Sequence, residues 1–161
     1  MWCFSRPRAR QFYRETMGWQ VNSDIPENVA IISITASTEE IQLGYLGGPE
    51  PHWFEEADNV LNLNFDDIPG DTLEYSGFTF TGLTMEDARR AVDFIVRNIN
   101  KDIYVNCRAG KSRSQAFVRF VLDCFPDRQT EINPGNPPET SNIDVLCKLK
   151  RVYRYEYGEN P

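Results

Sequence analysis

The feature that most constrains the fold is a strand, a short loop and a helix that follow one another directly within residues 103 to 124. Ile103–Val105 is a short run of β-branched and aromatic residues, which favours a buried strand. After a loop that contains Gly110, apolar residues recur at helical spacing over Ala116–Cys124. A helix that follows a strand directly is the unit from which parallel sheets are built, so this segment predicts an α/β protein.

Other parts of the chain extend this alternation of strands and helices. Val29–Thr35 is a nearly continuous apolar run, typical of a strand that is buried on both faces of a parallel sheet. Leu61–Phe65 alternates apolar residues with asparagines and predicts a second strand. Thr84 is the predicted N-cap of a helix whose apolar residues recur through Ile99. We therefore predict a single domain over 1–161, in which helices flank a central, mostly parallel sheet.

Composition and charge limit the classes of function. Of 161 residues, 40% are hydrophobic and 25% are charged, which is ordinary for a globular domain, and no apolar run approaches the roughly 20 residues that span a bilayer. The formal net charge of −7 argues against a nucleic-acid or membrane partner. The N-terminal residues lack the apolar core of a signal peptide, and the four cysteines show neither disulfide nor zinc spacing. We expect a cytoplasmic protein that needs no metal or other cofactor.

Positive charge is concentrated just after the strand at 103–105. Residues 108 to 119 hold four cations and no carboxylate, namely Arg108, Lys111, Arg113 and Arg119. The backbone N–H groups and the dipole at a helix N-terminus also favour an anion. The segment therefore indicates an anion site, with a solvated basic helix end as the alternative.

Two kinds of phosphate-binding loop fit part of this segment. Gly110–Ser112 resembles the end of a nucleotide-binding P-loop, whereas Cys107 and Arg113 have a spacing suited to a thiolate that attacks phosphorus. A P-loop requires a glycine five residues before Gly110, and that position is Val105, inside the strand. The nucleotide interpretation fails there and leaves a Cys-x-x-Gly-x-x-Arg-Ser pattern that begins at Cys107.

Each residue type in this pattern has a chemical use. A helix N-terminus, N–H donors and a nearby arginine lower the pKa of a thiol from about 8.5 into the range of about 3.5–7.5, so Cys107 is the expected nucleophile. Gly110 allows the loop to turn with its amides directed inward. Arg113 can grip two phosphate oxygens at once. Ser114 can donate a hydrogen bond to the Cys107 sulfur, which makes that sulfur a better leaving group when a phosphocysteine is hydrolysed.

The loop resembles the Cys-x5-Arg-Ser/Thr signature of the cysteine-dependent phosphatases in its dual-specificity form. The stretches "SITAS" at 33–37, "LNLNFDDI" at 61–68, "TMEDARRAVDFI" at 84–95 and "NPPETSNIDVL" at 136–146 are also similar to pieces of small dual-specificity-type phosphatases of bacteria and their phages. The resemblance implies a dual-specificity-phosphatase-like fold and the hydrolysis of phosphomonoesters through a phosphocysteine. It also implies a set of substrate-binding residues around the nucleophile: Asn106, Arg108, Ala109, Gly110, Lys111 and Ser112.

The resemblance further implies an aspartic acid that acts first as general acid and then as general base, a contribution of typically about 10²–10⁴-fold. The family carries this residue in an apolar-x-Asp-x pattern after the strand that precedes the long helix. Phe65-Asp66-Asp67-Ile68 fits this pattern. Asp67 matches best, Asp66 is the close alternative and Asp71 a distant one, and a turn with solvated carboxylates is the alternative without a catalytic role.

Two departures from the family's pattern affect these expectations. The family usually has histidine before the nucleophile, whereas this chain has Asn106, which can hydrogen-bond loop carbonyls but cannot carry charge, so we expect lower activity. The Gly-rich stretch 69–82 lengthens the interval between acid and nucleophile. It forms either a lid or recognition loop over the pocket, or a surface β-excursion that packs its own aromatic residues. We expect His52, the only histidine, at the surface. Cys3 could serve as a partner for an oxidised Cys107.

Basic residues in the loop bear on the substrate. Arg108 and Lys111 lie one and four positions after Cys107, where inositol-phosphate and phosphoinositide phosphatases of the tensin-like type also carry basic residues. Protein phosphatases have similar residues, and an acidic chain suits a membrane surface poorly. We expect a phosphorylated protein as substrate, with phosphotyrosine ahead of phosphoserine and phosphothreonine. The alternative substrates are small phosphorylated molecules such as inositol or nucleotide phosphates. The alternative classes of protein are a rhodanese-like sulfurtransferase and a phosphate-binding module without catalysis.

Overall fold

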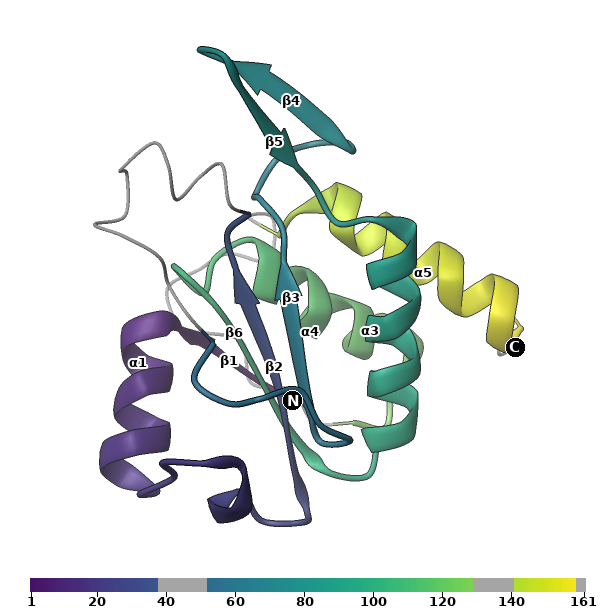
Figure 1. The fold of residues 1–161 in the computed structure, drawn as a ribbon. Coiled ribbons are helices and arrows are strands. Elements are labelled where there is room, and N and C mark those ends of the chain that lie inside the picture. Colours follow the sequence, from purple (N-terminus) through teal and green to yellow (C-terminus); the bar gives the residue numbers. More distant parts are fainter. Residues whose placement is uncertain (38–51, 129–140, 159–161) are drawn as a thin grey trace.

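The computed structural model describes residues 1–37, 52–128 and 141–158 of the chain (Figure 1). At its centre is a four-stranded sheet with the strand order β1-β6-β2-β3. Every pairing in this sheet is parallel, which confirms the predicted α/β architecture. The strands are β1 (Trp2–Ser5), β2 (Val29–Thr35), β3 (Val60–Asn64) and β6 (Asp102–Cys107).

Helices flank the sheet on both faces, and the sheet separates the core into two clusters. Because side chains alternate along a strand, Ile32 of β2 packs in a cluster with α3, α4 and α5, whereas Ile31 packs in a second cluster with Ala9 and Tyr13. This division explains why all seven residues of β2 are buried. The helical segments are α1 (Arg6–Arg10), a π-helical segment (Gln11–Thr16), a short 3₁₀ turn (Asn22–Asp24), α3 (Met85–Asn98), α4 (Arg113–Cys124) and α5 (Ile143–Tyr157).

The start of α3 confirms the capping prediction. The Thr84 hydroxyl accepts a hydrogen bond from the Asp87 backbone N–H at 3.0 Å, which satisfies one of the N–H groups that a helix start leaves without a partner in the helix. Ala88, Ala91 and Ile95 face the core on the inner side of α3.

Residues 69–82 contain a β-hairpin that extends beyond the carboxyl ends of β2 and β3 (Figure 1). Strands β4 (Thr72–Tyr75) and β5 (Phe78–Thr81) pair antiparallel. Ser76 and Gly77 between them have φ of 51° and 79°, as a type I′ turn requires. Tyr75 is 65% exposed. The stretch is thus a surface β-excursion, and its closure over the site as a lid stays a prediction.

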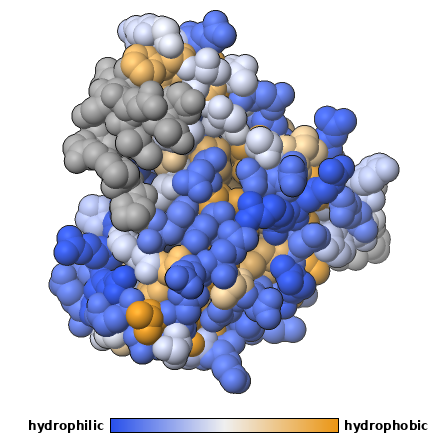
Figure 2. Space-filling model, in the orientation of Figure 1, coloured by the Kyte–Doolittle hydropathy of each residue, from blue (hydrophilic) through white to orange (hydrophobic). Residues whose placement is uncertain are grey.

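The surface of the described residues is mixed in polarity. The face in Figure 2 is mainly hydrophilic, with apolar side chains visible between the polar ones. None of the helices in the described ranges is long and apolar enough to cross a membrane. All four cysteines are free, and they differ in burial: Cys3 and Cys107 are buried, Cys124 is half-buried and Cys147 is exposed.

Candidate functional site

The residues of the Cys-x-x-Gly-x-x-Arg-Ser pattern lie at the carboxyl end of the sheet. Strand β6 ends at Cys107 and helix α4 begins at Arg113, so residues 108–112 form the connecting loop, called the Cys107 loop below. Because β6 lies between β1 and β2, the loop leaves from the interior of the sheet. The carboxyl ends of interior strands are where open α/β sheets place their ligands.

Gly110 allows the Cys107 loop to press against the end of β1. Its φ is +66°, and a Cβ at this position would lie 2.6 Å from the Ser5 backbone nitrogen, so no other residue fits without a shift of backbone. The Arg6 N–H donates to the Arg108 carbonyl at 3.0 Å, and the Gln115 side chain donates to the Gly110 carbonyl at 3.1 Å. The loop is therefore held between the β1–α1 junction and α4.

The Cys107 sulfur is buried on the sheet side of this loop. Its side chain is 2% exposed, and the Gly110 N–H donates to the sulfur at 3.3 Å. The Ser114 hydroxyl lies 3.0 Å from the same sulfur. The predicted nucleophile, glycine and serine are thus brought together as the sequence pattern implied.

Cys3 of β1 adds a second thiol to this cluster. Its sulfur donates to the Ser114 hydroxyl oxygen at 3.1 Å, and β1 pairs with β6 so that Cys3 lies opposite Val105. Since side chains on one face of a strand recur every second residue, Cys3 and Cys107 face the same side of the sheet. Burial raises the pKa of the Cys3 thiol to about 12, so this thiol keeps its proton at neutral pH.

Arg113 joins the loop to the segment that carries the candidate acids. Its side chain is buried, at 5% exposure, and its Nη1 donates to the Phe65 carbonyl oxygen at 2.7 Å. The guanidinium carbon lies 6.0 Å from the centre of the Phe65 ring. Phe65 directly precedes Asp66 and Asp67, so the arginine reaches from α4 to the end of β3.

Asp66 is a buried carboxylate with structural partners. It is 1% exposed and accepts hydrogen bonds from the Ser37 N–H at 2.9 Å, from the Ser37 hydroxyl and from the Thr81 N–H at 2.8 Å. These contacts join the ends of β2 and β5 to the end of β3. None of these hydrogen-bond donors belongs to the Cys107 loop.

Asp67 lies over the Cys107 loop. Its carboxylate is exposed and accepts hydrogen bonds from the Ser112 hydroxyl at 2.7 Å and from the Asn142 amide at 2.8 Å. Asp71, the distant candidate, instead forms an ion pair with Lys148 of α5 at 2.7 Å, and the hydrogen bond from that ammonium lowers the pKa of Asp71. Of the two adjacent carboxylates, Asp67 is the one that contacts the loop within the described ranges.

Asn142 is a site residue that the sequence analysis did not identify. Its Oδ1 accepts from the Val145 N–H at 3.1 Å and caps α5, while its amide donates to Asp67 and, at 3.2 Å, to the Ile68 carbonyl. Its own N–H donates to the Ser112 carbonyl at 3.3 Å. An asparagine before a periodic segment could have indicated the cap, but not the contact with a carboxylate 75 positions earlier.

Asn106 differs from the expectation. Its side chain is fully buried, and neither its amide nitrogen nor its amide oxygen has a hydrogen-bond partner within the described part of the chain. The predicted hydrogen bonds to loop carbonyls are therefore not formed there. Because neighbouring residues of a strand face opposite sides, Asn106 faces away from Cys107, toward the side of Ser33, its partner in the β2–β6 register.

His52 also differs from the expectation, because it is half-buried in a polar cluster on that side of the sheet. Its Nδ1 lies 2.9 Å from the Ser33 hydroxyl, and its Nε2 lies 3.2 Å from the Asn64 amide oxygen and 3.3 Å from the Thr35 hydroxyl. Burial lowers the pKa of His52. The ring is therefore a neutral bridge between the ends of β2 and β3.

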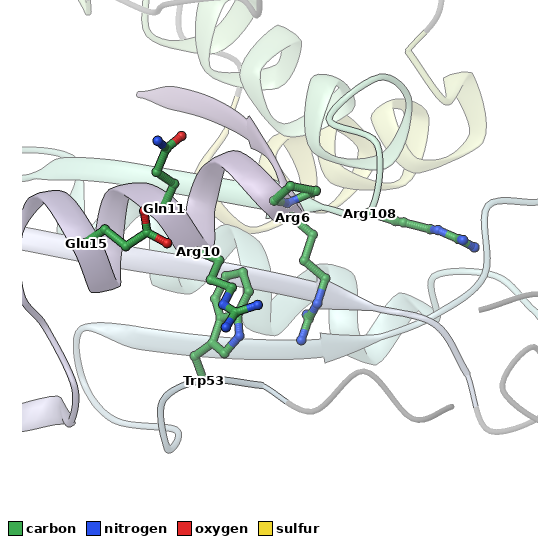
Figure 3. Close-up of a pocket in the computed structure, with 7 residues that line it drawn as sticks. Arg6, Arg10, Gln11, Glu15, Trp53 and Arg108 are labelled. Atoms are coloured by element: carbon green, nitrogen blue, oxygen red, sulfur yellow. The ribbon is translucent and has the colours of Figure 1, made fainter. Parts of the chain in front are cut away.

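The outer side of the Cys107 loop is exposed and basic. Arg108, Ala109 and Lys111 are all solvent-exposed. Arg108 also borders a hollow of about 830 Å³ whose other wall includes Arg6, Arg10 and Trp53 (Figure 3). The loop therefore has a buried side that carries the sulfur and an outer side that carries positive charge.

Neither a metal site nor a relative adds to this geometry. In the described ranges, no group of three or more His, Cys, Asp or Glu side chains is placed to hold a metal ion. Comparisons of the chain with protein-family models, with curated proteins and with solved structures found no match. The functional interpretation therefore depends on the residues of the site itself.

Proposed function

We propose that the protein is a cysteine-dependent phosphatase with a dual-specificity-phosphatase-like fold, which hydrolyses phosphomonoesters through a phosphocysteine intermediate. The observation that carries the proposal is the surroundings of the Cys107 sulfur. That sulfur receives the Gly110 N–H at 3.3 Å and lies 3.0 Å from the Ser114 hydroxyl, at the start of α4. N–H donors and a helix N-terminus stabilise both a thiolate and a bound phosphate.

In the first proposed step, the Cys107 thiolate attacks phosphorus. A sulfur–phosphorus bond forms, the bond from phosphorus to the substrate oxygen breaks, and Asp67 protonates the leaving oxygen. Arg113 and the loop N–H groups hold the phosphoryl oxygens while charge is redistributed. The family resemblance assigns phosphate binding to the loop residues Arg108, Ala109, Gly110, Lys111 and Ser112 and to Asn106 at the end of β6. Because the Asn106 side chain faces the other side of the sheet, its contribution is restricted to the backbone.

In the second proposed step, water attacks the phosphocysteine. Asp67, now a carboxylate, takes a proton from that water, the sulfur–phosphorus bond breaks, and inorganic phosphate leaves. The Ser114 hydroxyl donates to the departing Cys107 sulfur and stabilises its negative charge. The hydroxyl is already 3.0 Å from the sulfur, so this step needs no rearrangement of the serine.

Asp67 is the proposed acid because of its place rather than its charge state. It contacts Ser112 of the loop and Asn142, the N-cap of α5, whereas the three hydrogen bonds of Asp66 come from Ser37 and Thr81, outside the loop. A substrate that enters the loop would take the position next to Ser112 and release Asp67 to contact the leaving oxygen. We propose phosphorylated proteins as the substrate class, with phosphotyrosine first, and inositol or nucleotide phosphates as the alternative.

Steady-state hydrolysis of an aryl phosphate between pH 5 and 8 tests the proposal. We expect turnover by the wild type, none by Cys107→Ser, and full turnover by Cys147→Ser, which removes an exposed thiol from α5. Acid quenching with a ³²P-labelled phosphopeptide should leave the label on Cys107. No turnover by the wild type would contradict the proposal, and phosphopeptide binding without turnover would then indicate a phosphate-binding module.

A further inference from the structure

Adjacent strands β1 and β6 send the chain to opposite faces of the sheet. After β1 the chain enters α1, whose Ala9 packs with Tyr13 and Ile31 on one face. After β6 it passes through the Cys107 loop to α4, whose Ala116 and Phe117 pack on the other face. Where two neighbouring connections leave an α/β sheet in opposite directions, a crevice opens at the carboxyl ends of the strands, and ligands bind there.

A hollow of about 830 Å³ lies at this place, between the start of α1 and the Cys107 loop (Figure 3). Its volume falls within the range of about 300–1,000 Å³ that is typical of ligand sites. It is lined by Arg6 and Arg10 on one side and by Arg108 of the loop. We call it the arginine crevice. The Cys107 sulfur does not line it, so the crevice lies beside the proposed reaction centre.

The arginine crevice concentrates positive charge in a chain whose net charge is −7. Of the described residues that line it, three are arginines and one, Glu15, carries a carboxyl group. In Figure 3, Glu15 lies at the end away from Arg108, so the basic side chains lie nearer the loop. The Arg6 guanidinium carbon is 4.4 Å from the centre of the Trp53 ring, a cation–π contact that holds this side chain in place.

Backbone contact connects the crevice to the Cys107 loop. The Arg6 N–H donates to the Arg108 carbonyl at 3.0 Å, so the start of α1 and the loop are in direct contact at one end of the crevice. A peptide advances about 3.3–3.6 Å per extended residue. A substrate chain whose phosphorylated residue enters the loop would therefore reach the crevice with the residues next to it.

We propose that the arginine crevice binds the acidic side chains that flank the phosphorylated residue of a protein substrate. This inference rests on the proposed function and narrows its substrate class. Guanidinium groups pair with carboxylates through two parallel hydrogen bonds. Glu15 at the far end disfavours a compact polyanion that fills the whole hollow, whereas an extended peptide can place its carboxylates at the arginines and its backbone against Trp53.

Two phosphotyrosine peptides that differ only in flanking glutamates or glutamines test the inference. We expect the wild type to favour the glutamate peptide in kcat/KM by about 5-fold at low salt, the upper range for exposed ion pairs. Arg10→Ala should reduce this ratio toward 1, whereas Arg8→Ala, an exposed arginine of the same helix outside the crevice, should keep it. Raising the salt to 0.5 M should reduce the ratio as well. Hydrolysis of an aryl phosphate should be the same in both variants.

A binding measurement separates failure of this inference from failure of the proposed function. Fluorescein-labelled versions of both peptides are titrated with Cys107→Ser, with and without Arg10→Ala, and their anisotropy is recorded. If the two peptides have equal kcat/KM and equal affinity while aryl phosphate is hydrolysed, the proposed role of the arginine crevice is contradicted and the proposed phosphatase activity is supported. If no substrate is hydrolysed but the glutamate peptide binds more tightly in an Arg10-dependent way, the role of the crevice is supported and the phosphatase activity is contradicted. Hydrolysis of inositol hexakisphosphate in preference to both peptides, with sensitivity to Arg10→Ala, would assign the crevice to a small polyphosphate and overturn the inference.

Discussion

On the sheet side of the Cys107 loop the functional side chains are buried, and on its outer side they are exposed. Cys107, Ser114 and Arg113 are at most 5% exposed. The Ser114 hydroxyl lies 3.0 Å from the Cys107 sulfur, and Arg113 donates to the Phe65 carbonyl oxygen at 2.7 Å. Arg108 and Lys111 extend into solvent. A buried group with fixed partners can orient a reacting atom, whereas an exposed charge mainly attracts a ligand. Under the proposed function, we expect substitutions on the sheet side to alter the rate of the chemical step and those on the outer side to alter the choice of substrate.

The largest effect is expected from Arg113→Lys. An ammonium keeps the charge but loses the planar pair of donors, so kcat/KM for an aryl phosphate should fall about 10³- to 10⁵-fold, the range for arginines that stabilise phosphoryl transfer. Arg119→Lys on the exposed side of α4 is the matched control and should change kcat/KM less than 2-fold, in line with the small effect of exposed charges. Circular dichroism checks that both variants fold. A loss of less than tenfold in Arg113→Lys would show that the buried side does not determine the chemistry.

Asp66, which is buried, and Asp67, which is exposed, offer the same comparison between a buried and an exposed side chain in two adjacent residues. Asp67→Asn should lower kcat about 10²–10⁴-fold. Asp66→Asn should instead keep kcat within a few-fold. It should lower the free energy of unfolding by about 1–3 kcal/mol, because an amide would direct N–H groups at the donors of Ser37 or Thr81.

Kinetics and urea unfolding on the two variants measure both effects. If Asp66→Asn lowered kcat by the larger factor and Asp67→Asn kept it within a few-fold, the assignment of the acid would be reversed.

A structural feature could be predicted from the sequence where the interactions that cause it lie within a few residues of each other. Strand β2 and the start of α3 follow from a continuous apolar run and from an N-cap, both of which act within a few residues. The surroundings of Asp66 and Asp67 could not be predicted, because the two residues are chemically identical and only their contacts with distant segments distinguish them. The same holds for Cys3, whose contact with Ser114 spans 111 positions.

His52 lies between the buried and the exposed side chains, because its titratable ring is half-buried. Burial lowers its pKa, so the folded protein binds a proton at His52 less readily than the unfolded chain, whose histidine titrates near 6.5. As the pH falls below about 6.5, protonation therefore favours unfolding, and stability is lost in that window. We expect His52→Gln to lose less stability than the wild type between pH 7 and pH 5.

The measurement is urea unfolding at several pH values, with Asn28→Gln, an exposed amide in the turn before β2, as a control. An equal pH dependence in His52→Gln and the wild type would contradict the assignment of His52 as a neutral bridge.

The smallest effect is expected from Cys3, whose thiol donates to Ser114 at 3.1 Å while Ser114 lies 3.0 Å from Cys107. A hydroxyl has one proton, so a donor on its oxygen leaves that proton for the Cys107 sulfur. Loss of such a hydrogen bond is worth about 0.5–1.5 kcal/mol. Cys3→Ala should therefore slow hydrolysis of the phosphocysteine about 2- to 10-fold, and Cys3→Ser, which keeps a donor, should restore the rate.

The same geometry argues against a disulfide between Cys3 and Cys107. The two residues are diagonal neighbours on β1 and β6, which places their Cα atoms roughly 8 Å apart by strand spacing and rise, and a disulfide spans less than about 7 Å without backbone movement. After treatment with peroxide, mass spectrometry should find oxidised Cys107 without a bond to Cys3. A Cys3–Cys107 disulfide would show that the strand ends move, and the buried side of the loop would then be less rigid than its hydrogen bonds imply.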